Sequence, residues 1–120
     1  MKRTGSTNIE LVELINEIRK ISSKNKSNFW KRIILDLSKS SRQRRVANLF
    51  KINKFSNDNE TIIVPGKVLG TGILNKKVTV AAFNFSESAI EKIKKSGSEA
   101  LSINELLKKN PKGNDVRIIG

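Results

Sequence analysis

The spacing of apolar residues changes along the chain, and this change limits the folds that the chain can adopt. In the first half, apolar side chains recur every three or four residues, which is the period of one face of an α-helix. Three helices are therefore expected there. Their stripes are Leu11, Leu14, Ile15, Ile18 and Ile21; Trp30, Ile33, Ile34 and Leu37; and Val46, Leu49, Phe50 and Asn53.

Polar segments set the boundaries of these helices. Thr7 and Glu10 have the spacing of a capping box, so the first helix is expected to begin there and to end at the segment SSKNKSN. The second helix should end at SKSSR, and the third is predicted over residues 42–55. The tail MKRTGSTN has no apolar anchor, so residues 1–7 are expected to be flexible in the free protein.

The second half has the pattern of strands alternating with capped helices. The runs TIIV and KKVTVAAF predict two strands, and DVRIIG predicts a third at the end of the sequence. Ser86 is expected to cap a helix that runs to Lys95 before Gly97, and Ser102 with Glu105 repeats the capping-box spacing. The fold class is therefore α/β, with N-terminal helices followed by a mixed, partly parallel sheet and its covering helices, in one domain over residues 1–120.

The stretch TIIVPGKVLGTGIL contains glycines and a lysine, as phosphate-binding loops do, but in the wrong order. A Walker loop closes on Gly-Lys followed by Ser or Thr, whereas here Gly66 and Lys67 open the segment. The dinucleotide fingerprint also lacks its third glycine after Gly70 and Gly72. The glycines are expected to serve tight turns, with Pro65 breaking the edge of the strand and Lys67 able to touch a phosphate as a point contact.

The charge of the chain is concentrated in one segment. The chain has 24 Lys and Arg against 11 Asp and Glu, a net charge of +13. Residues 19–54 hold twelve of these bases and a single acid, Asp36, whereas residues 1–18 sum to −1 and residues 55–120 to +3. Such an excess attracts polyanions, so nucleic acid is the expected partner and an anionic membrane surface the weaker alternative.

The third predicted helix carries the bases in a pattern that suggests anion binding. Arg44, Asn48 and Lys51 would face away from its apolar stripe, and the run RQRR stands at its beginning, where the helix dipole favours acids. The aromatic side chains are interpreted differently. Because Trp30, Phe50 and Phe83 fall on apolar stripes, they are expected to pack in the core and not to stack on bases.

Several kinds of chemistry have no support in the sequence. Cysteine and histidine are absent, which removes the usual zinc ligands and the commonest general base, so no catalytic residue, metal site or cofactor is expected. No apolar run approaches the roughly 18 residues that a membrane span needs, and no signal-peptide core is apparent. The protein is expected to remain in the compartment where it is made.

Several long strings resemble one protein family over nearly the whole chain. VPGKVLGTGIL, KKVTVAAFNFSESAIEKIKKSG, NPKGNDVRIIG, the Trp30 helix and RQRRVANLFKINKF resemble the archaeal and eukaryotic large-subunit ribosomal protein L-eighteen-e, a relative of bacterial protein L-fifteen, in its short archaeal form. The resemblance implies a cytoplasmic, non-catalytic component of the large ribosomal subunit, with irregular strand-strand-helix turns in its core. Where relatives have an acid before Val-Asn-Leu, this chain has Val46 before Ala47-Asn48-Leu49.

The expected partners are large-subunit ribosomal RNA and neighbouring ribosomal proteins, with no membrane and no small-molecule substrate. RNA would be recognised by its shape and backbone, and the N-terminal tail would become ordered against it. A chromatin-type DNA-binding protein fits the charge and the helices equally well, whereas a phosphate-binding enzyme lacks a motif. The residues expected to bind RNA are Lys2, Arg3, Lys31, Arg32, Arg42, Arg44, Arg45, Asn48, Lys51, Lys54, Lys67 and Lys112.

Overall fold

The computed structural model describes the backbone of residues 5–39 and 45–120, with side chains from residue 9 onward. The N-terminal tail up to residue 4 and residues 40–44 lie outside this description. The elements are α1 (Gly5–Asn25), α2 (Asn28–Leu37), β1 (Arg45–Asn48), α3 (Leu49–Phe55), β2 (Thr61–Leu69), β3 (Thr79–Phe85), α4 (Glu87–Lys95), β4 (Glu99–Ser102), α5 (Ile103–Lys109) and β5 (Val116–Ile118).

The strands form one sheet in the order β1-β2-β3-β4, and β5 also pairs with β2. Each pairing among the described strands is parallel, which confirms the α/β class. The sheet was expected to be mixed and only partly parallel. β5 pairs with β2 over Thr61 to Ile63, and β1 pairs with it over Gly66 to Leu69. Two short strands from distant parts of the sequence therefore share one edge of β2, end to end.

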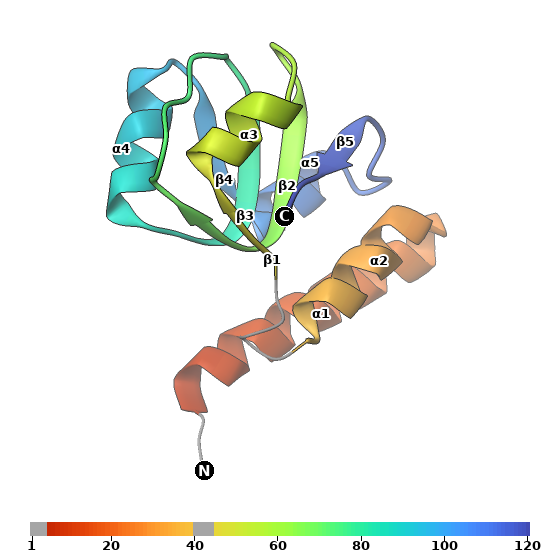
Figure 1. Ribbon diagram of the computed structural model, residues 1–120. Helices are drawn as coiled ribbons and strands as arrows, with labels where there is room; N and C mark the ends of the chain where they lie inside the picture. Colours follow the sequence, from red (N-terminus) through yellow and green to blue (C-terminus); the bar gives the residue numbers. More distant parts are fainter. Residues whose placement is uncertain (1–4, 40–44) are drawn as a thin grey trace.

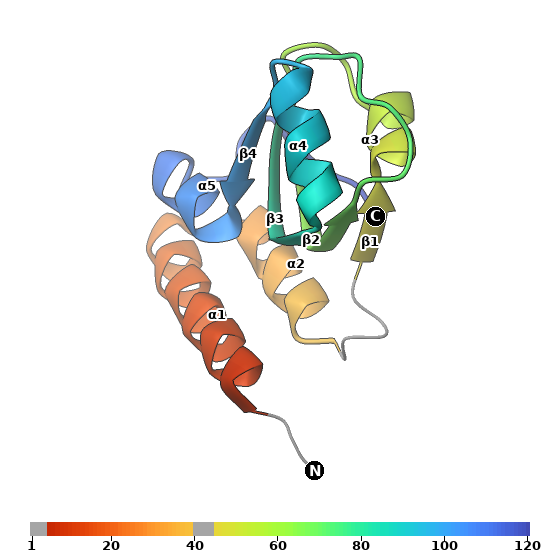
Figure 2. The same cartoon turned by 90° about the vertical axis from the view of Figure 1, so that its left-hand side faces the viewer.

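Helices cover both faces of the sheet, so the protein has three layers (Figures 1 and 2). On one face, residues of α1, α2 and α5 pack with Ile63, Ala81 and Leu101. On the other face, residues of α3 and α4 pack with alternate residues of the same strands, such as Ile62 and Val64. This alternation is expected of strands that are buried on both faces.

Trp30 anchors the α1–α2 pair to the body of the protein. Its side chain is fully buried, and its Nε1 donates a hydrogen bond of 3.1 Å to the carbonyl oxygen of Asn110. The ring of Phe29 meets it edge-on, with 5.1 Å between the ring centroids. The predicted core position of Trp30 is thus confirmed.

Local sequence signals in the second half correspond closely to the structure. The Ser86 hydroxyl accepts a hydrogen bond from the amide of Ala89 at the start of α4, and Gly97 follows that helix with a positive φ of 80°. Ser102 and Glu105 form the predicted capping box at the start of α5. Strand β4 was not predicted from the sequence, because its four residues also fit a short connection between two helices.

The predicted third helix over residues 42–55 is wrong in its first part. Residues Arg45 to Asn48 form strand β1, paired with β2, and the helix begins only at Leu49. Asn48 sets this boundary: its backbone is extended, and its Oδ1 accepts a hydrogen bond of 2.9 Å from the amide of Lys51. The first helix also differs from its prediction. It was expected to end at the segment SSKNKSN, but it continues into this segment as far as Asn25.

The shift of the helix boundary reverses the expected position of one aromatic residue. Leu49 and Ile52 are fully buried and face the core, whereas Phe50 is 61% exposed. The prediction that Phe50 packs in the core is therefore wrong. Phe83 is partly buried against the core, as expected.

The glycine-rich stretch is mostly strand. β2 continues through Pro65, and its register against β3 shifts between Val64 and Lys67, so Pro65 interrupts the regular pairing of the strand without ending it. At Gly66, a Cβ atom would collide with the backbone carbonyl of Arg45, so this glycine permits the close approach of β1 and does not form a turn. Gly72, with φ of 98°, does lie in the kind of turn conformation that was predicted.

Candidate nucleic-acid interface

The one acid of the basic segment is buried beneath three cations. The side chain of Asp36 in α2 is 1% exposed. Its carboxylate lies 3.1 Å from Nε of Arg45, 3.3 Å from Nζ of Lys39 and 3.6 Å from Nε of Arg32. In the described part of residues 19–54, no carboxylate therefore faces solvent.

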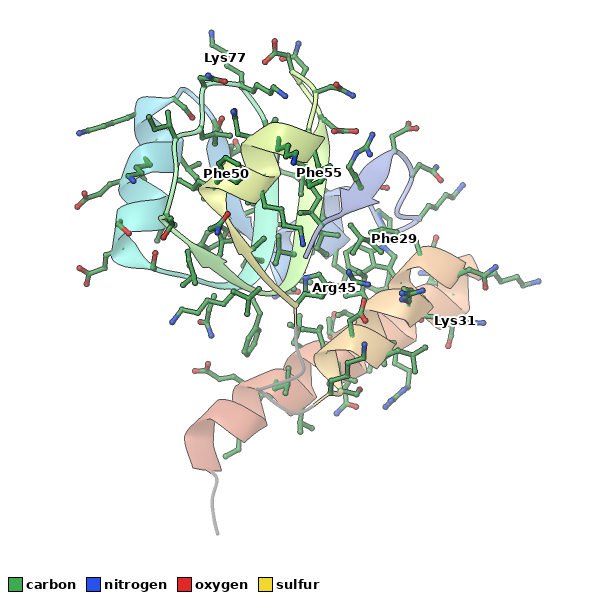
Figure 3. The ribbon with its side chains drawn as sticks, in the orientation of Figure 1. Phe29, Lys31, Arg45, Phe50, Phe55 and Lys77 are labelled. Carbon is green, nitrogen blue, oxygen red and sulfur yellow. The ribbon has the colours of Figure 1, made fainter. Side chains whose placement is uncertain are left out.

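Arg45 joins the α1–α2 pair to the sheet. Its side chain is 24% exposed, and besides Asp36 it reaches the carbonyl oxygen of Gly120 at 3.4 Å. Figure 3 shows it at the beginning of β1. Arg45 and Arg32 were both predicted to bind RNA. The structure gives Arg45 an intramolecular role, whereas the side chain of Arg32 remains 58% exposed despite its ion pair.

Lys31 and Lys112 come from segments that are distant in sequence and joined by a hydrogen bond. The hydroxyl of Ser27, which caps α2, donates to the carbonyl oxygen of Lys112 at 2.9 Å. Lys31 lies one turn further along α2, and both lysines are exposed. Figure 3 shows Lys31 on the outer side of that helix. Neither has a carboxylate within ion-pair distance among the described residues.

The predicted residues Asn48, Lys51 and Lys54 lie together around α3. They line a hollow of about 310 Å³ between this helix and the sheet edge, together with Val46, Phe50, Phe55 and Leu69. Lys67 on β2 is the register partner of Val46, and partners across neighbouring strands point to the same side of the sheet, so it lies next to this hollow. Asn48 is partly committed, because its side chain caps α3.

Phe50 and Phe55 are the residues of this surface that sequence reasoning missed. Both are at least half exposed, at 61% and 50%, and Figure 3 shows them on α3. The signal that identifies them is Asn48, a strongly preferred N-cap residue. A helix that begins after Asn48 turns Leu49 and Ile52 to the core and leaves both phenyl rings outside.

Four of the predicted RNA-binding residues lie outside the described part of the chain. They are Lys2, Arg3, Arg42 and Arg44. The same is true of most of the N-terminal tail and of the run RQR that precedes Arg45.

The glycine loop after β2 presents its carbonyl oxygens to a lysine and to a helix. Nζ of Lys92 donates to the carbonyl oxygens of Gly70 and Gly72, at 2.7 and 3.0 Å, and the carbonyl of Thr71 accepts from the amide of Phe50 at 3.0 Å. A phosphate-binding loop instead directs amide donors at its ligand. The arrangement therefore supports the structural interpretation of these glycines.

The described residues contain no group of three acidic, histidine or cysteine side chains arranged to hold a metal ion. Among the helices at 5–39 and 45–120, none is long and apolar enough to cross a membrane.

Comparison with known proteins agrees with the family suggested by the sequence motifs. A family model described as "Ribosomal protein 60S L18 and 50S L18e" matches residues 1–120. The large ribosomal subunit protein eL18 of Sulfurisphaera tokodaii is 46% identical over 117 residues, which cover 98% of this chain and 96% of that protein. The eL18 protein of Methanoregula boonei is 45% identical over 120 residues, covering 99% of each chain. That of Methanosphaerula palustris is 44% identical over 117 residues, covering 98% and 97%. The chain therefore belongs to the family of ribosomal proteins 60S L18 and 50S L18e.

Proposed function

We propose that this protein binds large-subunit ribosomal RNA through its basic helices and stabilises the folded form of that RNA. Its family membership makes it a component of the large ribosomal subunit in the cytoplasmic ribosome, and not an enzyme. The proposal concerns how it is held there. Lys31 on α2, Lys51 and Lys54 on α3, Lys67 on β2 and Lys112 would contact phosphates, and adjoining ribosomal proteins would complete its surroundings.

The observation that carries this proposal is the one-sided charge of residues 19–54. They hold twelve bases, and their only acid is buried. Exposed bases that lack an acidic partner repel one another, and an external polyanion relieves this repulsion while releasing its counterions. Lys2, Arg3, Arg42 and Arg44 belong to the proposed contact set on the basis of sequence alone.

Sedimentation tests the proposal at the level of the assembled particle. We expect the protein to sediment with large ribosomal subunits at low salt and to be released as the salt concentration rises. Recovery of the protein mainly on chromosomal DNA, or mainly unbound at low salt, would contradict the proposal. Preference for duplex DNA over folded ribosomal RNA at matched salt would support the DNA-binding alternative instead.

A pair of double variants tests whether the bases act at defined places. Replacing Lys51 and Lys54 by Gln should weaken binding to ribosomal RNA and reduce the slope of log affinity against log salt by about 0.7 to 0.9 for each phosphate that is no longer neutralised. The control is Lys94→Gln with Lys95→Gln on α4, which removes the same charge from exposed positions. Lys92 is unsuitable as a control because it bonds to the glycine loop. Equal losses of affinity in the two double variants would mean that only net charge matters.

A further inference from the structure

The hollow beside α3 combines apolar rings with positive charge and contains no acid. Val46, Asn48 and Leu69 line it from the strands, and Phe50, Lys51, Lys54 and Phe55 line it from the helix. Val46 is 49% exposed, so it extends the apolar surface formed by the two phenyl rings. Contiguous apolar surface of this kind, bordered by polar groups, is typical of a binding site.

The two phenylalanines contrast with the aromatic residues of the core. Trp30 is fully buried, whereas Phe50 is 61% and Phe55 50% exposed. Burying either ring fully would have been favourable, because it removes apolar surface from water. Their exposure on one short helix, next to a third exposed apolar residue, indicates a partner that covers them.

The helix that carries these rings is held firmly at both ends. At its start, Asn48 caps the helix and the amide of Phe50 bonds to the carbonyl of Thr71 at 3.0 Å. At its end, Nζ of Lys76 donates to the carbonyl oxygens of Asn53 and Ser56, at 2.7 and 2.6 Å. The rings are therefore presented on a fixed support, so little ordering is required when a partner binds.

The cations around the hollow select the kind of partner. Lys51 and Lys54 line it, and Lys67 stands on the neighbouring strand; none of the three has a carboxylate partner among the described residues. Nζ of Lys54 lies 5.5 Å from the centroid of the Phe55 ring, so charge and aromatic face occupy the same place. An apolar protein segment would cover these lysines without supplying a counter-charge.

An unpaired nucleotide satisfies both features at once. Its base has a flat face that stacks on a phenyl ring, and the phosphates on either side of it pair with lysines. A base inside a continuous duplex has no free face to offer. Building on the proposed function, we propose that the hollow between β1 and α3 receives an unpaired nucleobase of RNA, stacked on Phe50 or Phe55, with the adjoining phosphates at Lys51, Lys54 and Lys67.

Two short RNAs with the same number of phosphates test the stacking directly. One is a single-stranded oligonucleotide with all its bases, and the other has abasic nucleotides at central positions. The wild-type protein should bind the first about tenfold more tightly, since stacking on an aromatic side chain contributes that order of affinity per base. The Phe50→Leu, Phe55→Leu double variant should lose this preference, while the salt dependence of its binding stays the same.

Matched controls separate stacking from other effects of the substitutions. Ile73→Ala removes an apolar side chain that is 74% exposed and lies outside the hollow, so it should keep the preference for intact bases. A fully paired RNA duplex should bind equally to the wild type and to the double variant. Thermal unfolding of all three proteins should coincide, because the replaced side chains are exposed.

Each of the other outcomes overturns the proposal. A double variant that still prefers the intact RNA, or that loses the same affinity for both RNAs and the duplex, contradicts stacking in the hollow. If the wild-type protein binds both RNAs equally well, this inference is wrong but the proposed function is not affected. If it binds no RNA, both are wrong. If the double variant binds RNA normally but fails to join large subunits, the hollow is occupied by a protein segment.

Discussion

Helices α3 and α4 pack on the same face of the sheet but use their lysines in different ways. In α4, Glu87 lies in the first turn and three lysines in the last, the order that the helix dipole favours. One of them, Lys92, bonds to the glycine loop. In α3 no acid lies in the first turn, and Lys51 and Lys54 have no carboxylate partner in the described residues.

The difference separates charge that stabilises the protein from charge that is available to a ligand. The lysines of α4 complement the C-terminal end of their own helix or an adjacent loop. Those of α3 border exposed phenyl rings, and although Lys54 lies in the last turn of its helix, Lys51 does not. Equal numbers of lysines in two helices therefore do not imply equal roles. Four predictions separate contributions to stability from contributions to binding, in order of decreasing effect, and the third compares the two helices directly.

The largest effect is expected where the backbone leading to α3 meets the sheet. Gly66→Ala would place a methyl group against the carbonyl of Arg45 in β1, an atom that cannot rotate away, and should lower the free energy of unfolding by about 3 kcal/mol. Gly70→Ala would meet the Ser88 side chain and the amide of Ala89 at the start of α4. Because the nearest atom, the Ser88 hydroxyl oxygen, can rotate away, whereas the Ser88 Cβ and the Ala89 amide need only small shifts, about 2 kcal/mol is expected. Urea unfolding measures both losses of stability. A larger loss for Gly70→Ala than for Gly66→Ala would mean that β1 shifts more readily than α4 to make room for a methyl group.

The next effect concerns the ion pairs. Asp36→Ala should lower the free energy of unfolding by about 2 kcal/mol, because it leaves the largely buried Arg45 without its carboxylate partner. The cost is below that of a fully buried pair, since Arg32 and Lys39 are about half exposed and can be solvated. Glu99→Ala removes an ion pair with Lys109 that is exposed on both sides and should cost less than about 0.5 kcal/mol. Urea unfolding measures both costs. Similar losses of unfolding free energy in the two variants would mean that the Asp36 carboxylate does not anchor Arg45.

A smaller effect compares the two kinds of lysine directly. Lys92→Gln should lower the free energy of unfolding by about 1 kcal/mol, since the shorter side chain cannot make both carbonyl hydrogen bonds. Lys51→Gln should change stability by less than about 0.5 kcal/mol but reduce RNA affinity. Thermal unfolding and RNA titration of the two single variants are the measurements. A stability loss at Lys51 as large as that at Lys92 would remove the contrast between the helices.

The smallest effect lies outside the basic segment and depends on pH. The amide of Asn57 and the guanidinium of Arg117 donate to the Glu60 carboxylate, at 3.0 and 2.9 Å, and these bonds lower its pKa below the usual 4.5. A lowered pKa stabilises the fold above about pH 4.5, and this contribution is lost as the pH falls through the folded-state pKa. Glu60→Gln should therefore cost up to about 1 kcal/mol at pH 7 and much less near pH 3. Urea unfolding of the wild type and the variant at both pH values measures this cost. A difference in unfolding free energy that is the same at both pH values would contradict the prediction.

Apart from strand β4, the second half of the fold could be predicted from the sequence because its signals are local. Ser86, Gly97 and the Ser102–Glu105 pair act within one or two helical turns, and the structure contains each of them. Strand β1 could not be found in this way. Its extended backbone is stabilised by pairing with β2, about twenty residues further on, and a short run containing Val46 and Leu49 fits a helical period equally well.

The candidate interface was predictable in charge but not in detail. The excess of bases identified Lys31, Lys54 and Lys67, which are exposed, and Lys51, which is half-buried. It did not show that Arg45 is committed to Asp36, because that ion pair depends on how α2 and β1 are brought together. Nor did it reveal the exposed rings, because their orientation changed with the first residue of α3.

Trp30 gives the protein an intrinsic optical probe. It is the only tryptophan and the sequence has no tyrosine, so emission excited in the near ultraviolet comes almost wholly from one indole. That indole is fully buried and bonded to Asn110, where α2 meets the segment that follows α5. A red shift of its emission would report that water has reached this junction. Recording this emission while RNA is added can therefore show whether the α1–α2 pair stays docked on the body of the protein.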